Sequence, residues 1–253
     1  MHALELHAVS KCFQKQKKRF LAVDQVSFAI NAGECFGLVG ESGCGKSTIA
    51  RMITRLEPVS SGDVLINGSN LCAFQGKRSR DLYRQVQMVF QNPLDSFNPR
   101  ITLGNSISEI LINFGISRKE AYARMLQLLS QVGLEAEFAE RYPHQVSGGQ
   151  CQRAAIARAI AIEPSLLICD EATSALDVSV QAQIVELLAR LQQELHMACL
   201  FISHDLALVR SICARVAVMR HGRIVEQGDT QQVIDYPQEA YTKQLINSVF
   251  TVQ

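Results

Sequence analysis

A glycine-rich stretch near the start of the chain constrains its fold more than any other feature. Residues 40–48 read GESGCGKST and match the pattern G-x-x-x-x-G-K-[ST]. The short apolar run Cys35–Val39 before them predicts a strand, and residues 46–56 after them predict a helix. In this order the backbone N–H groups of the turn converge on phosphate oxygens, and the helix N-terminus points its positive end at the same place.

The loop therefore predicts a nucleotide site with its magnesium ion. Lys46 is expected to reach the β- and γ-phosphates of ATP, and the Ser47 hydroxyl is expected to ligate Mg²⁺. The residues expected to bind the nucleotide here are Gly40, Glu41, Ser42, Gly43, Cys44, Gly45, Lys46, Ser47 and Thr48.

Three further apolar runs, at residues 87–90, 166–169 and 200–202, predict strands. They are unbroken, as a parallel sheet covered on both faces requires. Residues 4–9 and 26–30 instead alternate between apolar and polar, which predicts half-buried antiparallel strands. The basic run at 14–19 between those two predicts a solvated hairpin loop, with contact to lipid headgroups as the alternative.

The segment between residues 92 and 163 has a different character. Ala121, Met125, Leu128, Leu129 and Val132 form one helical stripe, and Gly133 is suited to end that helix. Residues 92–163 are therefore expected to form a helical insertion between two strands of the sheet. Helices are also predicted at 180–195 and, interrupted by Pro237, at 231–249; segments 215–219 and 223–226 predict a hairpin around residues 221–222.

Composition sets outer limits on what the chain does. Its 253 residues, 47% apolar and 19% charged, are an ordinary globular balance and exclude a disordered or fibrous protein. The net charge of +1 gives no bulk basicity for binding nucleic acid. No run approaches the roughly 20 apolar residues of a membrane span. Eight cysteines without a Cys-x-x-Cys pair predict small buried hydrophobes in a reducing cytosol.

Two carboxylates follow the strand predicted at 166–169. Asp170 is placed to hold Mg²⁺, directly or through water, and Glu171 is placed to polarise an attacking water molecule. A strand that ends in Asp-Glu is a weak signal by itself. It becomes a strong one in a chain that also carries a phosphate loop.

A second anion-binding helix start is predicted at Ser147, Gly148, Gly149 and Gln150. Taken alone, this pattern also fits an ordinary helix capped by serine. One chain needs only one phosphate cradle, so two of them make sense if each serves a different nucleotide across a dimer.

These motifs together resemble the ATP-binding subunits of ABC transporters. The phosphate loop, Gln91, residues 147–150, residues 170–171, residues 174–177 and His204 occur in the order and rough spacing of that family. The resemblance implies an α/β fold with a P-loop NTPase core and a mixed sheet. It also implies an N-terminal antiparallel β subdomain and a helical insertion subdomain. The implied division of this single domain is 1–91 with 164–253 as the core, and 92–163 as the helical subdomain.

The resemblance also implies roles for individual residues. Phe13 is expected to stack on adenine, and Gln91 to contact Mg²⁺ and the attacking water and to sense a membrane partner. Residues 147–150 are expected to close on the γ-phosphate bound by the opposite subunit, and Asp177 to contact that subunit. His204 is expected to act beside Glu171 as the switch histidine.

A narrower match points to one branch of the family. Residues 91–100 and the C-terminal residues 237–245 are similar to the importers of peptides and nickel. Such importers use two ATPase subunits, two transmembrane permeases and an extracytoplasmic binding protein. We therefore expect an ATPase on the cytoplasmic face of the inner membrane that drives uptake of di- or oligopeptides or of nickel or another metal chelate. The short C-terminal tail favours the nickel group.

Several alternatives stay open at this point. The second ATPase subunit is either a copy of this chain or a paralogue. Another alternative is an ABC importer whose cargo is a different solute. Two other classes compete with this interpretation: a non-transport ABC ATPase that acts on nucleic acid or ribosomes, and a regulatory module that does not hydrolyse ATP. We expect no nucleic-acid partner.

Overall fold

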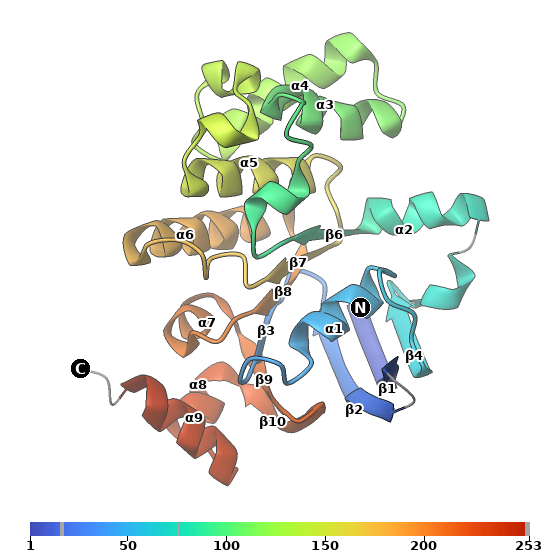
Figure 1. Ribbon diagram of the computed structural model, residues 1–253, viewed down its shortest axis with the longest axis vertical. Helices are drawn as coiled ribbons and strands as arrows, with labels where there is room; N and C mark the ends of the chain where they lie inside the picture. Colours follow the sequence, from blue (N-terminus) through green and yellow to red (C-terminus); the bar gives the residue numbers. More distant parts are fainter. Residues whose placement is uncertain (16–17, 75, 251–253) are drawn as a thin grey trace.

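The chain folds around two β-sheets, which the computed structural model describes over residues 1–15, 18–74 and 76–250 (Figure 1). Within these ranges the first sheet has the strand order β2-β1-β4-β5 and is antiparallel. Its strands are β1 (His2–Lys15), β2 (Lys18–Asn31), β4 (Ser61–Ile66) and β5 (Ser69–Asn70). The second sheet has the order β10-β9-β3-β8-β7-β6. Its strands are β3 (Cys35–Val39), β6 (Val86–Val89), β7 (Leu166–Asp170), β8 (Ala198–Ile202), β9 (Arg215–Arg220) and β10 (Arg223–Asp229).

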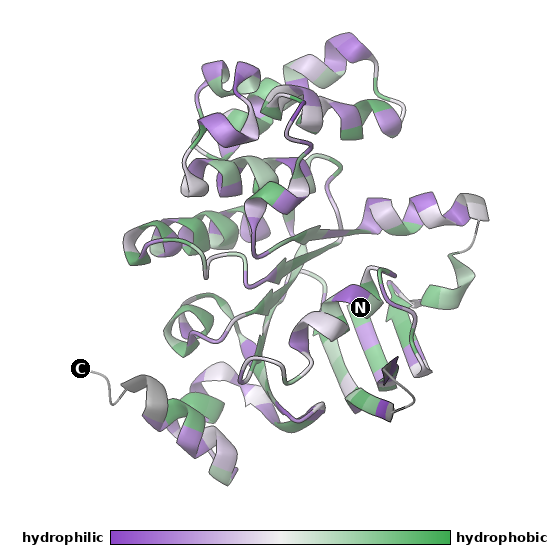
Figure 2. Ribbon diagram, viewed as in Figure 1, coloured by the Kyte–Doolittle hydropathy of each residue, from purple (hydrophilic) through white to green (hydrophobic). Residues whose placement is uncertain are grey.

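The second sheet is mixed: β9 and β10 pair antiparallel, and the other described pairs of neighbouring strands are parallel. Every residue of β3, β7 and β8 is buried, as the unbroken apolar runs predict. Alternate residues of these strands point to opposite faces of the sheet. One face, with Phe36 and Leu38, packs on α1 and the first sheet; the other, with Cys35 and Val39, packs on the helices that cover it. Figure 2 accordingly shows the central strands as the most continuous hydrophobic part of the ribbon.

Helices cover the central sheet and fill the connection between β6 and β7. They are α1 (Lys46–Ile53), α2 (Ser79–Gln85), α3 (Leu103–Asn113), α4 (Arg118–Gln131), α5 (Gly148–Ile160), α6 (Val178–Leu195), α7 (Leu206–Ile212), α8 (Thr230–Asp235) and α9 (Ala240–Phe250). Figure 1 shows α3, α4 and α5 together at the top of the molecule, with α6 between them and the sheet. The predicted fold class, with its mixed sheet, antiparallel N-terminal sheet and helical insertion, is confirmed.

The predicted helix at 121–132 begins earlier, at Arg118, because Ser117 caps it. The Ser117 hydroxyl accepts a hydrogen bond from the Glu120 N–H at 3.3 Å, which satisfies one of the free donors at a helix start. The helix gives way at Val132 to Gly133, whose φ of +73° is the left-handed conformation in which glycine ends helices. In the apolar stripe, Ala121, Met125, Leu129 and Val132 are buried as expected, and Leu128 is half-buried.

Several predicted boundaries are wrong, and the strands predicted at 4–9 and 26–30 are longer in the structure. The helix after the phosphate loop stops at Ile53 rather than at residue 56, because Arg55 takes a left-handed φ of +59°. The basic run 14–19 is not mainly a loop: β1 continues to Lys15 and β2 starts at Lys18, and the two residues pair across the hairpin. Residues 16 and 17 lie outside the described residues.

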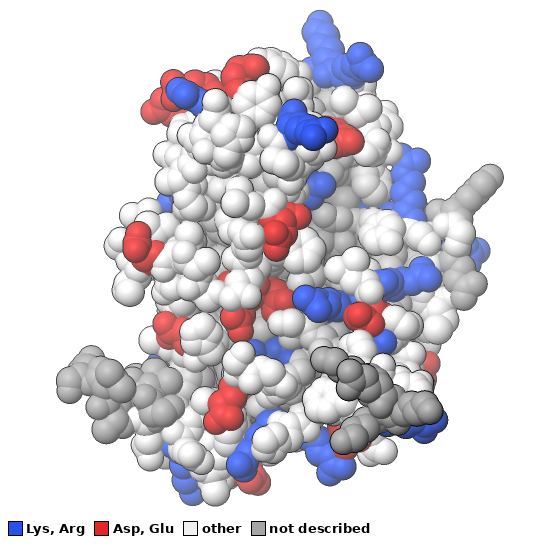
Figure 3. All heavy atoms as spheres, in the orientation of Figure 1, with Lys and Arg blue, Asp and Glu red and all other residues white. Residues whose placement is uncertain are grey.

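The surface agrees with the near-zero net charge. Figure 3 shows acidic and basic side chains on the same face, the acidic ones mostly along its middle and left and the basic ones mostly toward its right edge. Six of the eight cysteines are buried, and all eight are free thiols. Among the described helices, none combines the length and apolar character that crossing a bilayer requires.

Candidate functional site

The carboxyl ends of four neighbouring strands bring the predicted catalytic residues together. The phosphate loop follows β3, Gln91 follows β6, Asp170 ends β7 and His204 follows β8. These strands are parallel neighbours in the sheet, so their carboxyl ends share one edge. Ligands in open α/β sheets bind at that edge.

The phosphate loop is held by hydrogen bonds from Lys46 to its own backbone. The Lys46 side chain is buried, and its Nζ donates hydrogen bonds to the carbonyl oxygens of Gly40 at 2.7 Å and Glu41 at 2.9 Å. The loop needs glycine at position 40, where φ is +148° and an added Cβ would lie 2.2 Å from the carbonyl oxygen of Met219. The backbone path thus holds a cationic group next to the helix start that faces incoming phosphates.

A cavity of about 300 Å³ lies over this loop. The residues that line it are Phe13, Phe20, Ala22, Ser42, Gly43, Gly45, Lys46, Ser47, Thr48, Gln91 and Glu171. The structure therefore brings residues of three predicted groups to one cavity. They are the phosphate loop, the adenine-contacting Phe13, and Gln91 with Glu171. Gly40, Glu41 and Cys44 belong to the loop but do not line the cavity.

Two aromatic residues are among those that line the cavity. Phe13 and Phe20 pair across the β1–β2 hairpin, and Phe20 is 61% exposed. The buried Lys11 ammonium lies 4.7 Å from the Phe13 ring centroid, and it is held by Glu57 at 2.9 Å. Sequence reasoning missed Phe20; the signal that finds it is the hairpin register, which places it opposite Phe13.

The hydroxyl of Ser47 donates a hydrogen bond to Oδ1 of Asp170 at 2.9 Å. Burial raises the pKa of Asp170, an effect that the Ser47 hydrogen bond opposes and the nearby Glu171 carboxylate reinforces. A buried carboxylate beside a hydroxyl is an oxygen donor set of the kind that Mg²⁺ accepts. Among the described residues there is no cluster of three His, Cys, Asp or Glu that would hold a metal alone.

Glu171 is held at one of its two carboxylate oxygens. Gln91 Nε2 donates a hydrogen bond to Glu171 Oε2 at 3.2 Å, and His204 Nδ1 lies 3.9 Å from the same oxygen. Gln91 Nε2 also contacts the Ser174 hydroxyl at 3.1 Å, so Ser174 positions Gln91. The Glu171 backbone adopts a left-handed φ of +49°, a strained conformation that its N–H stabilises by donating to the Ile202 carbonyl of β8.

Residues 147–150 lie in a different place. Ser147 caps α5: its hydroxyl accepts from the Gln150 N–H at 3.3 Å, and Gln150 Oε1 accepts from the Ser147 N–H at 2.9 Å. With Asp177 they line a separate cavity of about 320 Å³ that shares no lining residue with the first. Asp177 is exposed and its side chain does not cap α6. Within one chain, the structure therefore does not bring these residues to the phosphate loop.

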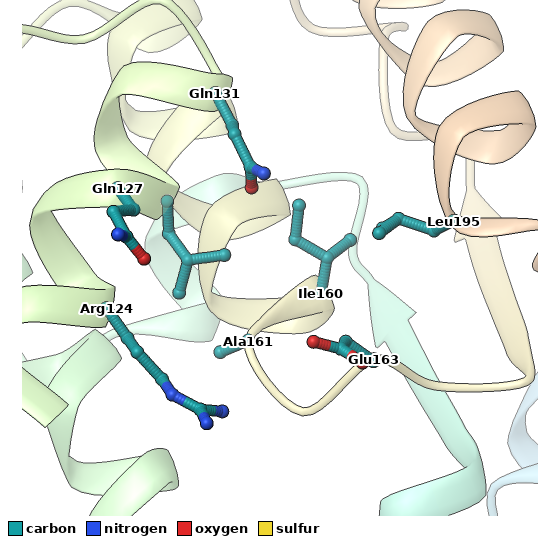
Figure 4. A pocket seen from close by; sticks show the side chains of 8 residues that line it. Arg124, Gln127, Gln131, Ile160, Ala161, Glu163 and Leu195 are labelled. Carbon is teal, nitrogen blue, oxygen red and sulfur yellow. The ribbon is translucent and has the colours of Figure 1, made fainter. Parts of the chain in front are cut away.

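A third cavity, of about 300 Å³, contains none of the predicted residues. Figure 4 shows Arg124, Gln127 and Gln131 of α4 around it, facing Ile160, Glu163 and Leu195. The charged head of Arg124 is already paired with Glu120 at 3.0 Å. Of these three cavities, the one over the phosphate loop is lined by Lys46 and Ser47 together with Gln91 and Glu171.

Comparison with known proteins agrees with this geometry. The sequence profile of the family described as "ABC transporter" matches residues 23–174. The glutathione import ATP-binding protein GsiA of Pectobacterium atrosepticum is 50% identical over 229 residues, which are 90% of this chain and 37% of that protein. The oligopeptide transport ATP-binding protein OppF of Bacillus subtilis is 44% identical over 252 residues, which are 97% of this chain and 82% of that protein.

Solved structures agree as well. The ATP-binding cassette MJ0796, solved as a dimer in a post-hydrolysis state with ADP and Pi, has a TM-score of 0.82 and 28% identity. The match covers 90% of this chain and 98% of that one. The cbiO1 protein of Clostridium perfringens, part of an ABC transporter complex, has a TM-score of 0.82 and 26% identity over 99% and 96% of the two chains. The chain belongs to the ABC transporter family as an ATP-binding domain.

Proposed function

We propose that the chain is the ATP-hydrolysing subunit of an importer for di- or oligopeptides. Support comes from relatives whose names describe the import of glutathione and the transport of oligopeptides. The chain spans 37% of the length of the first of these relatives and 64% of a probable peptide transporter subunit from Sinorhizobium fredii. The activity and the cargo of those longer proteins are therefore carried to this chain as proposals. Nickel as cargo stays a prediction.

The observation that carries the proposal is the convergence of Lys46, Ser47, Gln91 and Glu171 on one cavity. When phosphates enter, Lys46 exchanges its two carbonyl partners for phosphate oxygens, a charge-assisted contact that is stronger. Ser47 and Asp170 would hold Mg²⁺, which supplies neutralisation of the charge on the phosphates. Phe13 and Phe20 offer faces for the adenine ring.

Glu171 orients the attacking water. Gln91 occupies Oε2, so Oε1 is the oxygen placed to accept a hydrogen bond from that water. Water then attacks the γ-phosphorus, the bond from phosphorus to the bridging oxygen breaks, and ADP leaves with its electron pair. The proton passes from water to phosphate or to the Glu171–His204 pair.

The separate cavity formed by residues 147–150 and Asp177 supports a head-to-tail dimer. In that arrangement the Ser147 cap and the α5 N-terminus of one chain close on the γ-phosphate bound by its partner, a second copy or a related ATPase subunit. The segment 92–163 would carry this cap and transmit closure to two permeases, with the core formed by 1–91 and 164–253. An extracytoplasmic binding protein would deliver cargo, and the chain would lie peripherally on the cytoplasmic face of the inner membrane.

The test is Glu171→Gln, with the exposed Glu163→Gln as a control for the same chemical change. Loss of the water-orienting carboxylate should lower kcat for phosphate release by roughly 10²–10⁴ while ATP affinity is retained. Glu163→Gln should hydrolyse ATP like the wild type. Wild-type turnover by Glu171→Gln would sink the assignment.

Cargo is tested separately, in vesicles that contain the complete transporter. The proposal expects ATP hydrolysis to rise when the binding protein is loaded with a mixture of di- and oligopeptides. Stimulation by a nickel chelate and not by peptides would replace the peptide proposal by the nickel prediction and leave the ATPase assignment in place.

A further inference from the structure

The C-terminal helix reaches back to the phosphate loop through one side chain. Tyr241, in the first turn of α9, accepts a hydrogen bond on its hydroxyl from the Glu41 N–H at 3.2 Å. The residue is 5% exposed, and its ring packs within the hydrophobic core on the helix-covered face of the central sheet. The segment around Tyr241 resembles the peptide and nickel branch, and the proposed hydrolysis makes no use of it.

This contact fixes the Gly40–Glu41 peptide unit, whose carbonyl oxygen accepts a hydrogen bond from the phosphate-binding Lys46 at 2.7 Å. The N–H of Glu41 donates to Tyr241, and the carbonyl oxygen of the same residue accepts from Lys46 Nζ at 2.9 Å. Residue 41 is thus held from both sides before any phosphate is present. Its exposed side chain plays no part in either bond, so the identity of residue 41 matters less than its backbone position.

The Tyr241 ring is itself held by the end of strand β9. The Arg220 guanidinium lies 4.6 Å from the ring centroid, a cation–π contact. The residue before it, Met219, presents the carbonyl oxygen that approaches Gly40 so closely that only glycine fits there. The end of β9, the start of the phosphate loop and α9 therefore meet at one point, which Figure 1 shows as the approach of α8 and α9 to β9.

The chemistry of a tyrosine suits this position. A tyrosine hydroxyl is neutral at neutral pH and adds no negative charge next to an incoming triphosphate, and burial raises the pKa of Tyr241 further. A carboxylate in the same place would accept the N–H equally well but repel the phosphates. A phenylalanine would fill the same volume and leave the N–H without this partner.

We propose that Tyr241 is a positioning residue that preorganises the phosphate loop for ATP. It does so through the N–H of the Gly40–Glu41 peptide unit, and it does not line the cavity over the loop. This inference rests on the proposed function in one respect, namely that the loop binds ATP. A loop that is held in its binding conformation before ATP arrives loses less entropy on binding.

The variant that tests this is Tyr241→Phe, with Tyr236→Phe as its matched control because Tyr236 is 72% exposed. Calorimetric titration of the full chain with a non-hydrolysable ATP analogue should show affinity roughly three- to tenfold weaker for Tyr241→Phe. KM for ATP should rise by the same factor with kcat unchanged, since ground state and transition state lose the contact equally. Tyr236→Phe should match the wild type in both.

A second measurement separates positioning from loss of structure. Hydrogen exchange followed by mass spectrometry should be faster in Tyr241→Phe for peptides that contain residue 41, and unchanged in peptides from β7 and β8. The melting temperature without nucleotide should fall by no more than about 3 °C, as expected for one hydrogen bond in a chain of this size.

The outcomes are distinct. Unchanged ATP affinity and unchanged exchange at residue 41 in Tyr241→Phe overturn the inference and leave the proposed function intact. A lower kcat with an unchanged KM overturns it too, because the role would then lie in the reaction. A wild-type chain that does not bind the analogue overturns the proposed function and this inference with it.

Discussion

The substitution Ser147→Ala separates a structural role of the α5 cap from a role in catalysis. The chain offers a matched control in Ser117→Ala, because both serines are exposed helix caps whose hydroxyls accept from the backbone N–H three residues later at 3.3 Å. Loss of such a cap costs about 1 kcal/mol of stability. In a chain of this length that corresponds to a fall in melting temperature of about 2–4 °C for either variant.

The two variants should differ sharply in ATP hydrolysis. If Ser147 closes on the γ-phosphate of the partner chain, its loss removes a contact to the charge of the transition state, which is worth roughly 10²–10³ in rate. Ser117 lies at the start of α4, so the Ser117→Ala variant should hydrolyse ATP at the wild-type rate. Thermal unfolding by circular dichroism and phosphate release under saturating ATP measure both effects. Equal hydrolysis by the two variants would refute the proposed role of the cap.

Three further predictions concern the loop and its cavity. Burial raises the pKa of Asp170, so ionisation of this side chain destabilises the nucleotide-free fold as the pH rises through that pKa. Asp170→Asn should therefore have a higher melting temperature than the wild type at pH 7. The difference in melting temperature should shrink as the pH falls toward the ordinary Asp pKa of 3.8. Melting curves across that range check this. Gly40→Ala should fail to give a folded chain by circular dichroism, because its Cβ meets the carbonyl oxygen of Met219. Gly43 has open space around it and a φ of +80°, so Gly43→Ala should fold with a free energy of unfolding lower by about 1–2 kcal/mol. Phe20→Ala, which removes a ring 61% exposed, should leave stability within about 0.5 kcal/mol of the wild type and weaken ATP binding severalfold in calorimetric titration.

Local patterns predicted most of the core correctly. The strand Cys35–Val39 was predicted to the residue, because a parallel strand buried on both faces reads as an unbroken apolar run. The helix α3 (Leu103–Asn113) was missed, although Leu103, Ile107 and Leu111 recur with helical spacing and are buried. Strand β4 begins Ser-Gly-Asp, a poor strand sequence, and exists because it pairs with β1.

The candidate site was predictable where it is local and unpredictable where it depends on the fold. The loop carries its own geometry, so residues 40–48 could be found from spacing alone. The Ser47–Asp170 hydrogen bond joins residues far apart in the sequence, which the predicted Mg²⁺ role of both residues had already linked. Only the resemblance to the family pointed to Gln91, which contacts Glu171. The contact between Tyr241 and Glu41 had no signal in the sequence.

The most direct test of the two half-sites is complementation between two inactive variants. Lys46→Ala removes the phosphate lysine and Ser147→Ala removes the cap, so each should be nearly inactive alone. In a mixed head-to-tail dimer, one of the two sites combines an intact loop with an intact cap. Mixing equal amounts should therefore restore phosphate release to roughly a quarter of the wild-type rate, as half the dimers are mixed and each has one complete site. A mixture no more active than the two variants measured separately would contradict a site shared between chains.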